Sequence, residues 1–380
     1  TQTAIFAFGI SMSVLMAASL ILPALQQNTV QAPEQDALEP TATPAPEYPD
    51  PLTDFSGISF DGSVYLHPTG IFTVPVPTGW EPTQPFNTAS QVQANMNNPD
   101  QLSIIESYIQ TPITPITSLE DLSAVFTFNT LASSWARYTN WEELSRELDE
   151  ENNQLKIDFR LARGNQNFFA QHVAWYDEDF VYVTRVVAPE NATELLFYMV
   201  ENMAGTIEVL PQFRDTPLGF SGYFDDANEQ IIRYPQAWRI TDSAPGLTSI
   251  EGEEVAVRVE VQDDLIADED AARAYTEALR PDVAIASVES VSRNGGEGFS
   301  VAYNYRTPDG AGRSGLVVLL NGEDEKLHVA NAVVEATNVD LNADEIDPAY
   351  IDVVNALNTF SLLRGLNLYE PPAPELPPVI

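Results

Sequence analysis

Residues 65–80 read YLHPTGIFTVPVPTGW, and residues 225–240 read DDANEQIIRYPQAWRI. Each stretch contains a strand-like run that ends in the motif P-x-x-W, at Trp80 in the first and at Trp238 in the second. Large aromatic side chains usually pack in cores, so tryptophans at matching points of two similar runs indicate one shared structural role. The pair therefore predicts that one domain is written twice along the chain.

The later parts of the two candidate copies also match. Residues 168–187 and residues 315–334 each read as two alternating strands about a tight acidic turn, which is the pattern of a β-hairpin. A capped helix then follows in both copies, from Asn191 in the first and from Asp347 in the second. A short strand follows each helix. The order of elements is therefore preserved along both copies.

The middle of each copy carries a helical pattern as well. Apolar side chains recur at helical spacing over residues 118–137 and over residues 268–279. Strand-like residues follow both of these stretches. We predict two domains, residues 57–211 and residues 219–364, joined by a short linker at 212–218.

The first copy resembles the PsbP-like family, through HPTGIFTVPVPTGW at residues 67–80 and through the later long hairpin and helix. That family comprises the photosystem II extrinsic proteins and their bacterial relatives. The second copy is similar through PQAW at residues 235–238 but lacks a counterpart of HPTG. The resemblance implies an α+β protein with two tandem α/β/α sandwich domains, each an antiparallel sheet flanked by helices. It also implies an accessory or assembly role without a shared catalytic residue.

The N-terminal stretch from Ala4 to Leu25 has no charged residue and matches the roughly 20 apolar residues that cross a bilayer. A cleaved signal peptide and a retained anchor both fit such a stretch. We favour a transmembrane anchor at residues 1–25, because the apolar run exceeds that of a usual signal peptide. Residues 26–56 then read as a Pro-rich linker, and residues 365–380 read as a Pro-rich tail.

The charges after the apolar stretch predict its orientation. Several acids but no Lys or Arg precede Arg137, so the positive-inside rule places the bulk of the chain on the extracytoplasmic side. Gly9, Ser13 and Ala17 form a small-x-x-x-small row on which another membrane helix could pack closely. Small residues are also common in signal segments. On the anchor interpretation, we expect integral membrane protein subunits among the partners.

The whole chain is strongly acidic. It has 380 residues, of which 56 are Asp or Glu and 17 are Lys or Arg, for a formal net charge of -39. A field of this sign repels phosphate backbones and excludes nucleic acid as a partner. It fits a basic or cationic extracytoplasmic partner, but we favour the simpler interpretation that the acidic residues keep the protein soluble. The absence of cysteine excludes disulfides, thiol catalysis and Cys-ligated metals.

Motifs for catalysis are scarce. Residues 310–315 read GAGRSG, a literal G-x-G-x-x-G, but strand-like residues stand on both sides of it. A dinucleotide site needs a helix after the glycines, so we interpret this motif as a hairpin turn. His67, His172 and His328 lie far apart in the sequence and belong to no metal-binding motif. The sequence therefore predicts no catalytic residue and no cofactor.

Acidic hairpin turns are the remaining candidates for chemistry. Carboxylates in loops are ligands that calcium prefers, and solvated turns explain the same residues. The candidate calcium ligands are Asp177, Glu178 and Asp179 in the first copy and Glu323, Asp324 and Glu325 in the second. We expect a non-catalytic, membrane-anchored accessory subunit that acts through protein–protein contacts. A cell-surface ligand- or calcium-binding module is the alternative.

Overall fold

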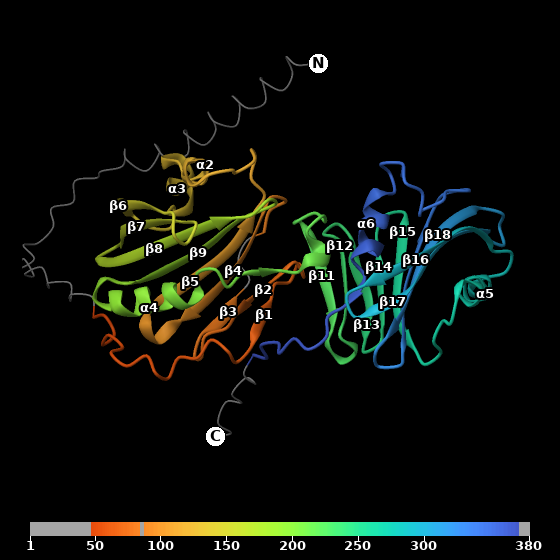
Figure 1. Cartoon of the computed structure of the whole chain (residues 1–380), viewed down its shortest axis with the longest axis horizontal. Coiled ribbons are helices and arrows are strands. Elements are labelled where there is room, and N and C mark those ends of the chain that lie inside the picture. Colours follow the sequence, from red (N-terminus) through yellow and green to blue (C-terminus); the bar gives the residue numbers. More distant parts are fainter. Residues whose placement is uncertain (1–46, 84–86, 372–380) are drawn as a thin grey trace, which may run out of the picture. The chain divides into compact units, whose positions relative to one another are not determined.

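The computed structural model describes residues 47–83 and 87–371, which belong to one compact unit (Figure 1). The expected anchor with Gly9, Ser13 and Ala17, most of the Pro-rich linker and the end of the tail lie outside these residues. Within the described ranges, no helix is both long enough and apolar enough to cross a membrane.

Two seven-stranded antiparallel sheets dominate the structure, and they have the same strand order. The first contains, in spatial order, β3 (Glu81–Thr83), β4 (Gln91–Asn98), β5 (Ser103–Gln110), β9 (Val181–Pro189), β8 (Gln166–Tyr176), β7 (Gln154–Arg163) and β6 (Asn140–Asp149). The second contains β13 (Arg239–Ala244), β14 (Leu247–Glu251), β15 (Val255–Gln262), β19 (Leu327–Val334), β18 (Gly312–Gly322), β17 (Gly296–Arg306) and β16 (Ala284–Arg293). We call the parts built around these sheets repeat 1 and repeat 2.

Each repeat also has a three-stranded antiparallel sheet. In repeat 1 it consists of β1 (Val64–Leu66), β2 (Phe72–Pro75) and β10 (Glu208–Val209). In repeat 2 it consists of β11 (Phe220–Asp225), β12 (Gln230–Pro235) and β20 (Ser361–Leu362). In both repeats the strand that follows the last helix pairs with an early strand, so the end of each repeat is tied to its beginning.

Helices pack on both faces of each large sheet. In repeat 1, α4 (Thr193–Met203) packs on β8 and β9, while α2 (Leu119–Val125) packs on the opposite face beside α3 (Phe128–Ser134). In repeat 2, α6 (Ile351–Thr359) packs on β12, β18 and β19, and α5 (Glu269–Leu279) packs on β16 and β17. Every one of these contacts encloses its own apolar cluster, so each repeat has two cores.

The predicted fold class is wrong. The described residues are 44% strand and 18% helix and form four antiparallel sheets, so the protein is more β-rich than a pair of α/β/α sandwiches. The predicted helix over residues 118–137 is two seven-residue helices, because the Thr127 hydroxyl accepts a hydrogen bond from the Thr130 N–H and caps a new helix. The transmembrane helix included in that prediction lies outside the described residues.

The outer strands of the large sheets are poor templates for a further strand. Three of the four outer strands, β6, β13 and β16, each contain a register shift. Bulges and short edge strands hinder edge-to-edge pairing. Contacts with other proteins therefore belong more naturally on loops and helices than on sheet edges.

Candidate functional site

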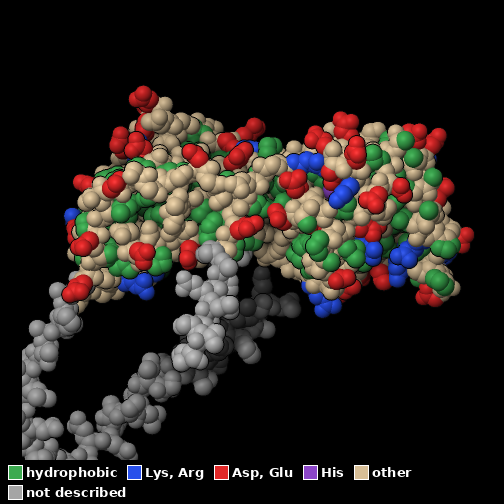
Figure 2. Space-filling model, turned by 90° about the horizontal axis from the view of Figure 1, so that it is seen from below, with side chains coloured by type: hydrophobic (Ala, Val, Ile, Leu, Met, Phe, Trp, Pro, Cys, Tyr) green, Lys and Arg blue, Asp and Glu red, His purple; other side chains and the backbone are tan. Residues whose placement is uncertain are grey.

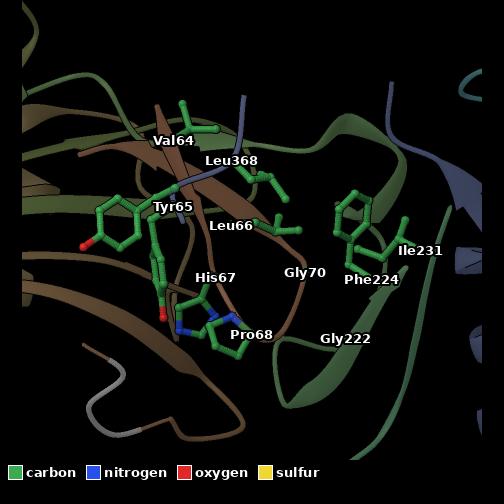
Figure 3. A pocket seen from close by; sticks show the side chains of 11 residues that line it. Val64, Tyr65, Leu66, His67, Pro68, Gly70, Gly222, Phe224, Ile231 and Leu368 are labelled. Carbon is green, nitrogen blue, oxygen red and sulfur yellow. The ribbon is translucent and has the colours of Figure 1, made fainter. Parts of the chain in front are cut away.

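A crevice of about 220 Å³ lies among β1, the β11–β12 hairpin and the C-terminal segment (Figure 3). Its walls are largely apolar. They include Val64, Leu66, Phe224, Ile231 and Leu368, together with His67 and the rings of Tyr65 and Tyr369. We call it the junction pocket, because residues of both repeats line it.

His67 is the one histidine in this lining, and its ring is held on both nitrogens. Nδ1 accepts a hydrogen bond from the Thr69 N–H at 3.2 Å, which makes Nε2 the protonated nitrogen that donates to Gln93 O at 3.1 Å. The ring also stacks on Phe72, with centroids 4.8 Å apart. Burial lowers the pKa of His67 to about 4, so the imidazole is neutral at physiological pH.

The hydrogen bond from Nε2 of His67 to Gln93 O satisfies a backbone carbonyl of β4. In the described part of the chain, β3 pairs with residues 95–97 of β4, and the Gln93 carbonyl lies two residues before that pairing. The imidazole satisfies this carbonyl from the side. Since both ring nitrogens are committed to the backbone, the junction pocket offers an apolar surface and no acid–base group at His67.

Arg233 ties the two repeats together beside the junction pocket. Its side chain is fully buried and donates to Thr69 O and Pro217 O, each at 2.7 Å, and to the Thr216 hydroxyl. No carboxylate pairs with it among the described residues, and burial lowers its pKa to about 9. The guanidinium therefore serves as a buried hydrogen-bond donor that links repeat 2 to a turn of repeat 1 and to the linker.

The chain after repeat 2 makes a second connection to repeat 1. Val64 N–H donates to Asn367 O, and Tyr369 N–H donates to Val64 O, both at 2.9 Å, so Leu368 forms a parallel bridge with Val64. Leu363, Leu366 and Tyr369 pack into the core of repeat 1. We call residues 363–369 the C-terminal strap.

The candidate calcium ligands of repeat 1 are tied to an arginine. Asp177 accepts hydrogen bonds from the Tyr182 hydroxyl and from the Phe180 N–H, and it forms an ion pair with Arg214 at 2.8 Å. Arg214 also pairs with Asp179 at 3.0 Å. Burial raises the pKa of Asp177, but these hydrogen bonds outweigh it and hold the pKa below its usual range. Glu178 is exposed.

Repeat 2 has a similar arrangement. Asp324 pairs with Arg364 at 2.8 Å and lies 3.3 Å from Nε2 of His328, while Glu323 and Glu325 are exposed. Burial lowers the pKa of His328, and Asp324 opposes this shift only in part. In each repeat, an aspartate of the acidic turn thus binds an arginine that follows the last strand. We call these contacts the two latches.

No candidate metal-binding cluster occurs in the described part of the chain. The described residues contain no group of three or more His, Asp or Glu side chains that could hold a metal ion. His172 lies alone on β8, fully buried against Phe126 and Tyr108. Burial lowers its pKa well below the usual value, and the nearby Arg185 adds to this shift. The structure does not bring the three histidines together.

The sequence analysis did not identify Arg214 and Arg364, the two arginines that form the latches. Arg214 stands in the PQFRDTP linker and Arg364 stands shortly after NTFSLL, so each copy has a cation soon after its last strand. Their matching positions after the two copies indicate a shared role, and an acidic turn in each copy is the natural partner for such a cation. The GAGRSG motif does form a hairpin turn, between β17 and β18, where Gly310 adopts a positive φ of 87°.

A groove of about 460 Å³ lies on the other side of repeat 1, between the ends of β4 and β5 and the two short helices. Gln91 and Gln110 form part of its lining with Asp121 and Val125, and Ile113 stands at its side. We call it the helix-pair groove. It mixes amides, hydroxyls and aliphatic groups with a single charge, which suits the binding of another surface rather than a reaction.

Comparisons with known proteins give no family. No family model matches the chain, and no curated protein matches it. Among solved structures, it is similar to the cyanobacterial PsbP from Synechocystis sp. PCC 6803, with 15% identity and a TM-score of 0.27 over 38% of this chain and 92% of that one. It is also similar to the immunity protein TplEi from Pseudomonas aeruginosa, with 8% identity and a TM-score of 0.23 over 75% and 98%. At such TM-scores, neither likeness identifies a function.

A protein from Bacteroides thetaiotaomicron is similar as well, with 10% identity and a TM-score of 0.26 over 37% of this chain and 47% of that one. The sequence motif HPTGIFTVPVPTGW resembles the PsbP-like family, and the solved structure of cyanobacterial PsbP shows a weak structural likeness to this chain. That likeness covers 38% of the chain, which is about the length of one repeat. That likeness concerns the fold alone.

Proposed function

We propose that this protein is a non-catalytic accessory or assembly subunit of a membrane protein complex and that it acts through protein–protein contacts. The apolar stretch from Ala4 to Leu25 would hold it at the membrane, with the bulk of the chain on the extracytoplasmic side. The Pro-rich residues that follow would serve as a semi-stiff spacer.

One observation carries the proposal: the side chains best suited to chemistry hold the fold together. Both nitrogens of His67 bind backbone groups, and His172 is fully buried. Asp177 and Asp324 of the acidic turns each bind an arginine. Catalytic groups need access to a substrate and a pKa near the working pH. The two histidines are buried, and all four residues have a pKa below its ordinary value, so none of them is set up as an accessible general acid or base.

The surface also suits protein contacts. On the face in Figure 2, carboxylates are spread among uncharged side chains, and Lys and Arg side chains are fewer. Several aliphatic and aromatic side chains are nevertheless exposed, including Ile113, Phe128 and Leu265. Apolar side chains surrounded by charge are typical of surfaces that meet a partner. An accessory role is also what the PsbP-like resemblance implies.

Native electrophoresis of gently solubilised membranes tests this proposal. We expect the full chain to migrate in an assembly well above its own 41.8 kDa and to co-purify with at least one membrane-spanning polypeptide. Migration as a lone species, with no other polypeptide retained after mild purification, would contradict the proposal.

A further inference from the structure

Ile113 is the most exposed large apolar side chain of the described residues, with a relative exposure of 102%. It lies in the loop that joins β5 to α2, between Pro112 and Pro115. Proline fixes φ, so the loop is partly ordered before anything binds to it. An aliphatic side chain held out by such a loop can bury its surface in a partner at a small cost in entropy.

Leu265 occupies the matching place in repeat 2. It lies in the loop that joins β15 to α5, and its relative exposure is 50%. The next residue anchors this loop: Ile266 is only 7% exposed, its N–H donates to Oδ1 of Asn321 at 2.9 Å, and its carbonyl accepts from Nδ2 of the same residue. Because Ile266 is fixed inward, Leu265 is held outward.

The two side chains correspond in the topology. β5 and β15 occupy the same position in their sheets, and Ile113 and Leu265 are each the third residue after the strand. The surrounding sequences, TPITPITS and DDLIADED, share little else. The two repeats differ in sequence, but both expose an aliphatic side chain at the same position after the equivalent strand. This indicates that the position has the same function in both repeats.

Exposed acidic residues lie in or shortly after both loops. Glu120 and Asp121 follow Ile113 at the start of α2, and hydrogen bonds from Thr117 lower the pKa of Asp121. Neither acid forms an ion pair among the described residues. Arg146, which reaches the end of α2, pairs with Glu143.

Repeat 2 has the same charge around its loop. Asp263, Asp264 and Asp270 are exposed and have no ion-pair partner in the described part of the chain. Arg273 of α5 pairs with Glu269. In both loops, an exposed aliphatic side chain is thus accompanied by nearby carboxylates that form no ion pair among the described residues.

We propose that Ile113 and Leu265 are the centres of two matched docking points, each of which takes a protein segment with Lys or Arg beside apolar side chains. The apolar side chains of the partner cover Ile113 or Leu265, and its cations pair with the surrounding carboxylates. The helix-pair groove gives the first point additional contact area. The inference rests on the proposed function and adds where the partner binds and what its chemistry is.

The test uses a defined probe, the acetylated and amidated peptide Lys-Leu-Lys-Leu-Lys. It is titrated calorimetrically into the full chain in a non-ionic detergent, with a detergent blank. A Glu-Leu-Glu-Leu-Glu peptide is the charge control. The protein variants are Ile113→Thr, Leu265→Thr and both together, with Ile240→Thr as a matched change of another exposed isoleucine on β13. None of these variants alters a charge.

We expect two sites per wild-type chain and per Ile240→Thr chain, one site in each single variant and none in the double variant. Loss of the aliphatic contact should raise Kd at the altered site about tenfold or more, by the usual value of burying such a side chain. Equal binding by the double variant and the wild type, or equal binding of the Glu peptide, would overturn the inference. That outcome can arise while the chain still migrates in an assembly, so it is distinguishable from failure of the proposed function.

Discussion

Gly222 allows the two repeats to approach closely. A Cβ atom added to Gly222 would lie 2.8 Å from the Gly70 nitrogen and 2.9 Å from the Thr69 carbonyl carbon, both of which are backbone atoms. Backbone cannot move aside as a flexible side chain can. The same turn of repeat 1 accepts the hydrogen bond from Arg233, so crowding at Gly222 should also disturb that contact.

We expect Gly222→Ala to lower the free energy of unfolding by about 1–3 kcal/mol, the usual cost of overpacking a tight contact. Chemical denaturation measures this value. Gly57→Ala is the matched control, because a Cβ at Gly57 meets nothing within 4 Å and should leave stability nearly unchanged. Equal effects of the two substitutions would mean that the close approach at Gly222 does not contribute to stability.

His67 should make stability depend on pH. In the unfolded chain its imidazole takes up a proton near pH 6.5, whereas the folded chain resists protonation until about pH 4. Protonation therefore favours the unfolded state between these values. The contribution of His67 is complete above pH 6.5 and should fall by about 3 kcal/mol as the pH drops to 4.

The comparison of wild type with His67→Gln isolates this contribution from the many carboxylates that titrate in the same range. Glutamine can still donate to Gln93 O and accept from the Thr69 N–H, so it replaces the ring without the proton uptake. We expect the stability difference between the two proteins to shrink or reverse as the pH falls from 7 to 4. A difference that stays constant over that range would contradict the assignment.

At the scale of elements, the two latches join each acidic hairpin turn to the segment that leaves its repeat. The side chains of Arg214, Asp177 and Asp179 are each about one-third exposed or more, so water screens their attraction. Exposed ion pairs of this kind contribute roughly 0–1 kcal/mol. Their importance is that they occupy the carboxylates that would otherwise be available to a cation.

Calcium should therefore have no effect on the intact turns. We expect 1–2 mM calcium, in about the range of weak extracellular sites, to leave the melting temperature of the full chain unchanged and to produce no heat of binding. Arg214→Gln and Arg364→Gln free the two turns and provide the comparison. A calcium-dependent rise in melting temperature in the wild type would support the calcium module over the accessory subunit.

The elements also show what the sequence pattern could and could not predict. Alternation finds strands well, and the hairpins expected over 168–187 and 315–334 are β8–β9 and β18–β19. The helical pattern over 118–137 gave no sign of its break, because Phe126 fits the apolar stripe and only the Thr127 cap marks the new start. The small sheets were missed since β10 and β20 are two residues long and pair with distant strands.

The candidate site was predictable only in outline. The sequence located the acidic turns but could not show that Arg214 and Arg364 fold back onto them, since neighbours in space are set by the topology. Ile113 and Leu265 were also overlooked. A single aliphatic residue in a loop is unremarkable in sequence, and its significance appears only when both repeats expose one at the same point. The domain boundaries stay predictions, as does the docking row at Gly9, Ser13 and Ala17.

On the scale of the whole molecule, the C-terminal strap returns from repeat 2 to pair with β1 of repeat 1. The repeats are therefore connected at the linker, at Arg233 and at the strap. A chain that ends at Leu362 lacks the strap, while one that ends at Pro371 keeps it and is the matched control. We expect the first to melt at a lower temperature, with a broader or double transition, and the second to melt as the full chain does.

Loss of the strap removes the burial of Leu363, Leu366 and Tyr369 as well as their backbone bonds. Such a loss should cost several kcal/mol, because the fully buried Leu363 contributes roughly 1.5–3 kcal/mol and the half-buried Leu366 and Tyr369 each contribute part of that. Identical melting of both truncated chains would show that the repeats do not depend on the strap for their connection.

Photochemical cross-linking in the cells that make the protein tests the central claim most directly. A photoreactive amino acid is placed at position 113, at position 265 or, as the control, at position 240, in the otherwise unchanged full chain. If this protein works by docking at matched points, positions 113 and 265 should each form a cross-link to another polypeptide, and position 240 should not. Cross-linking that is absent at 113 and 265, or equally strong at 240, would contradict the account.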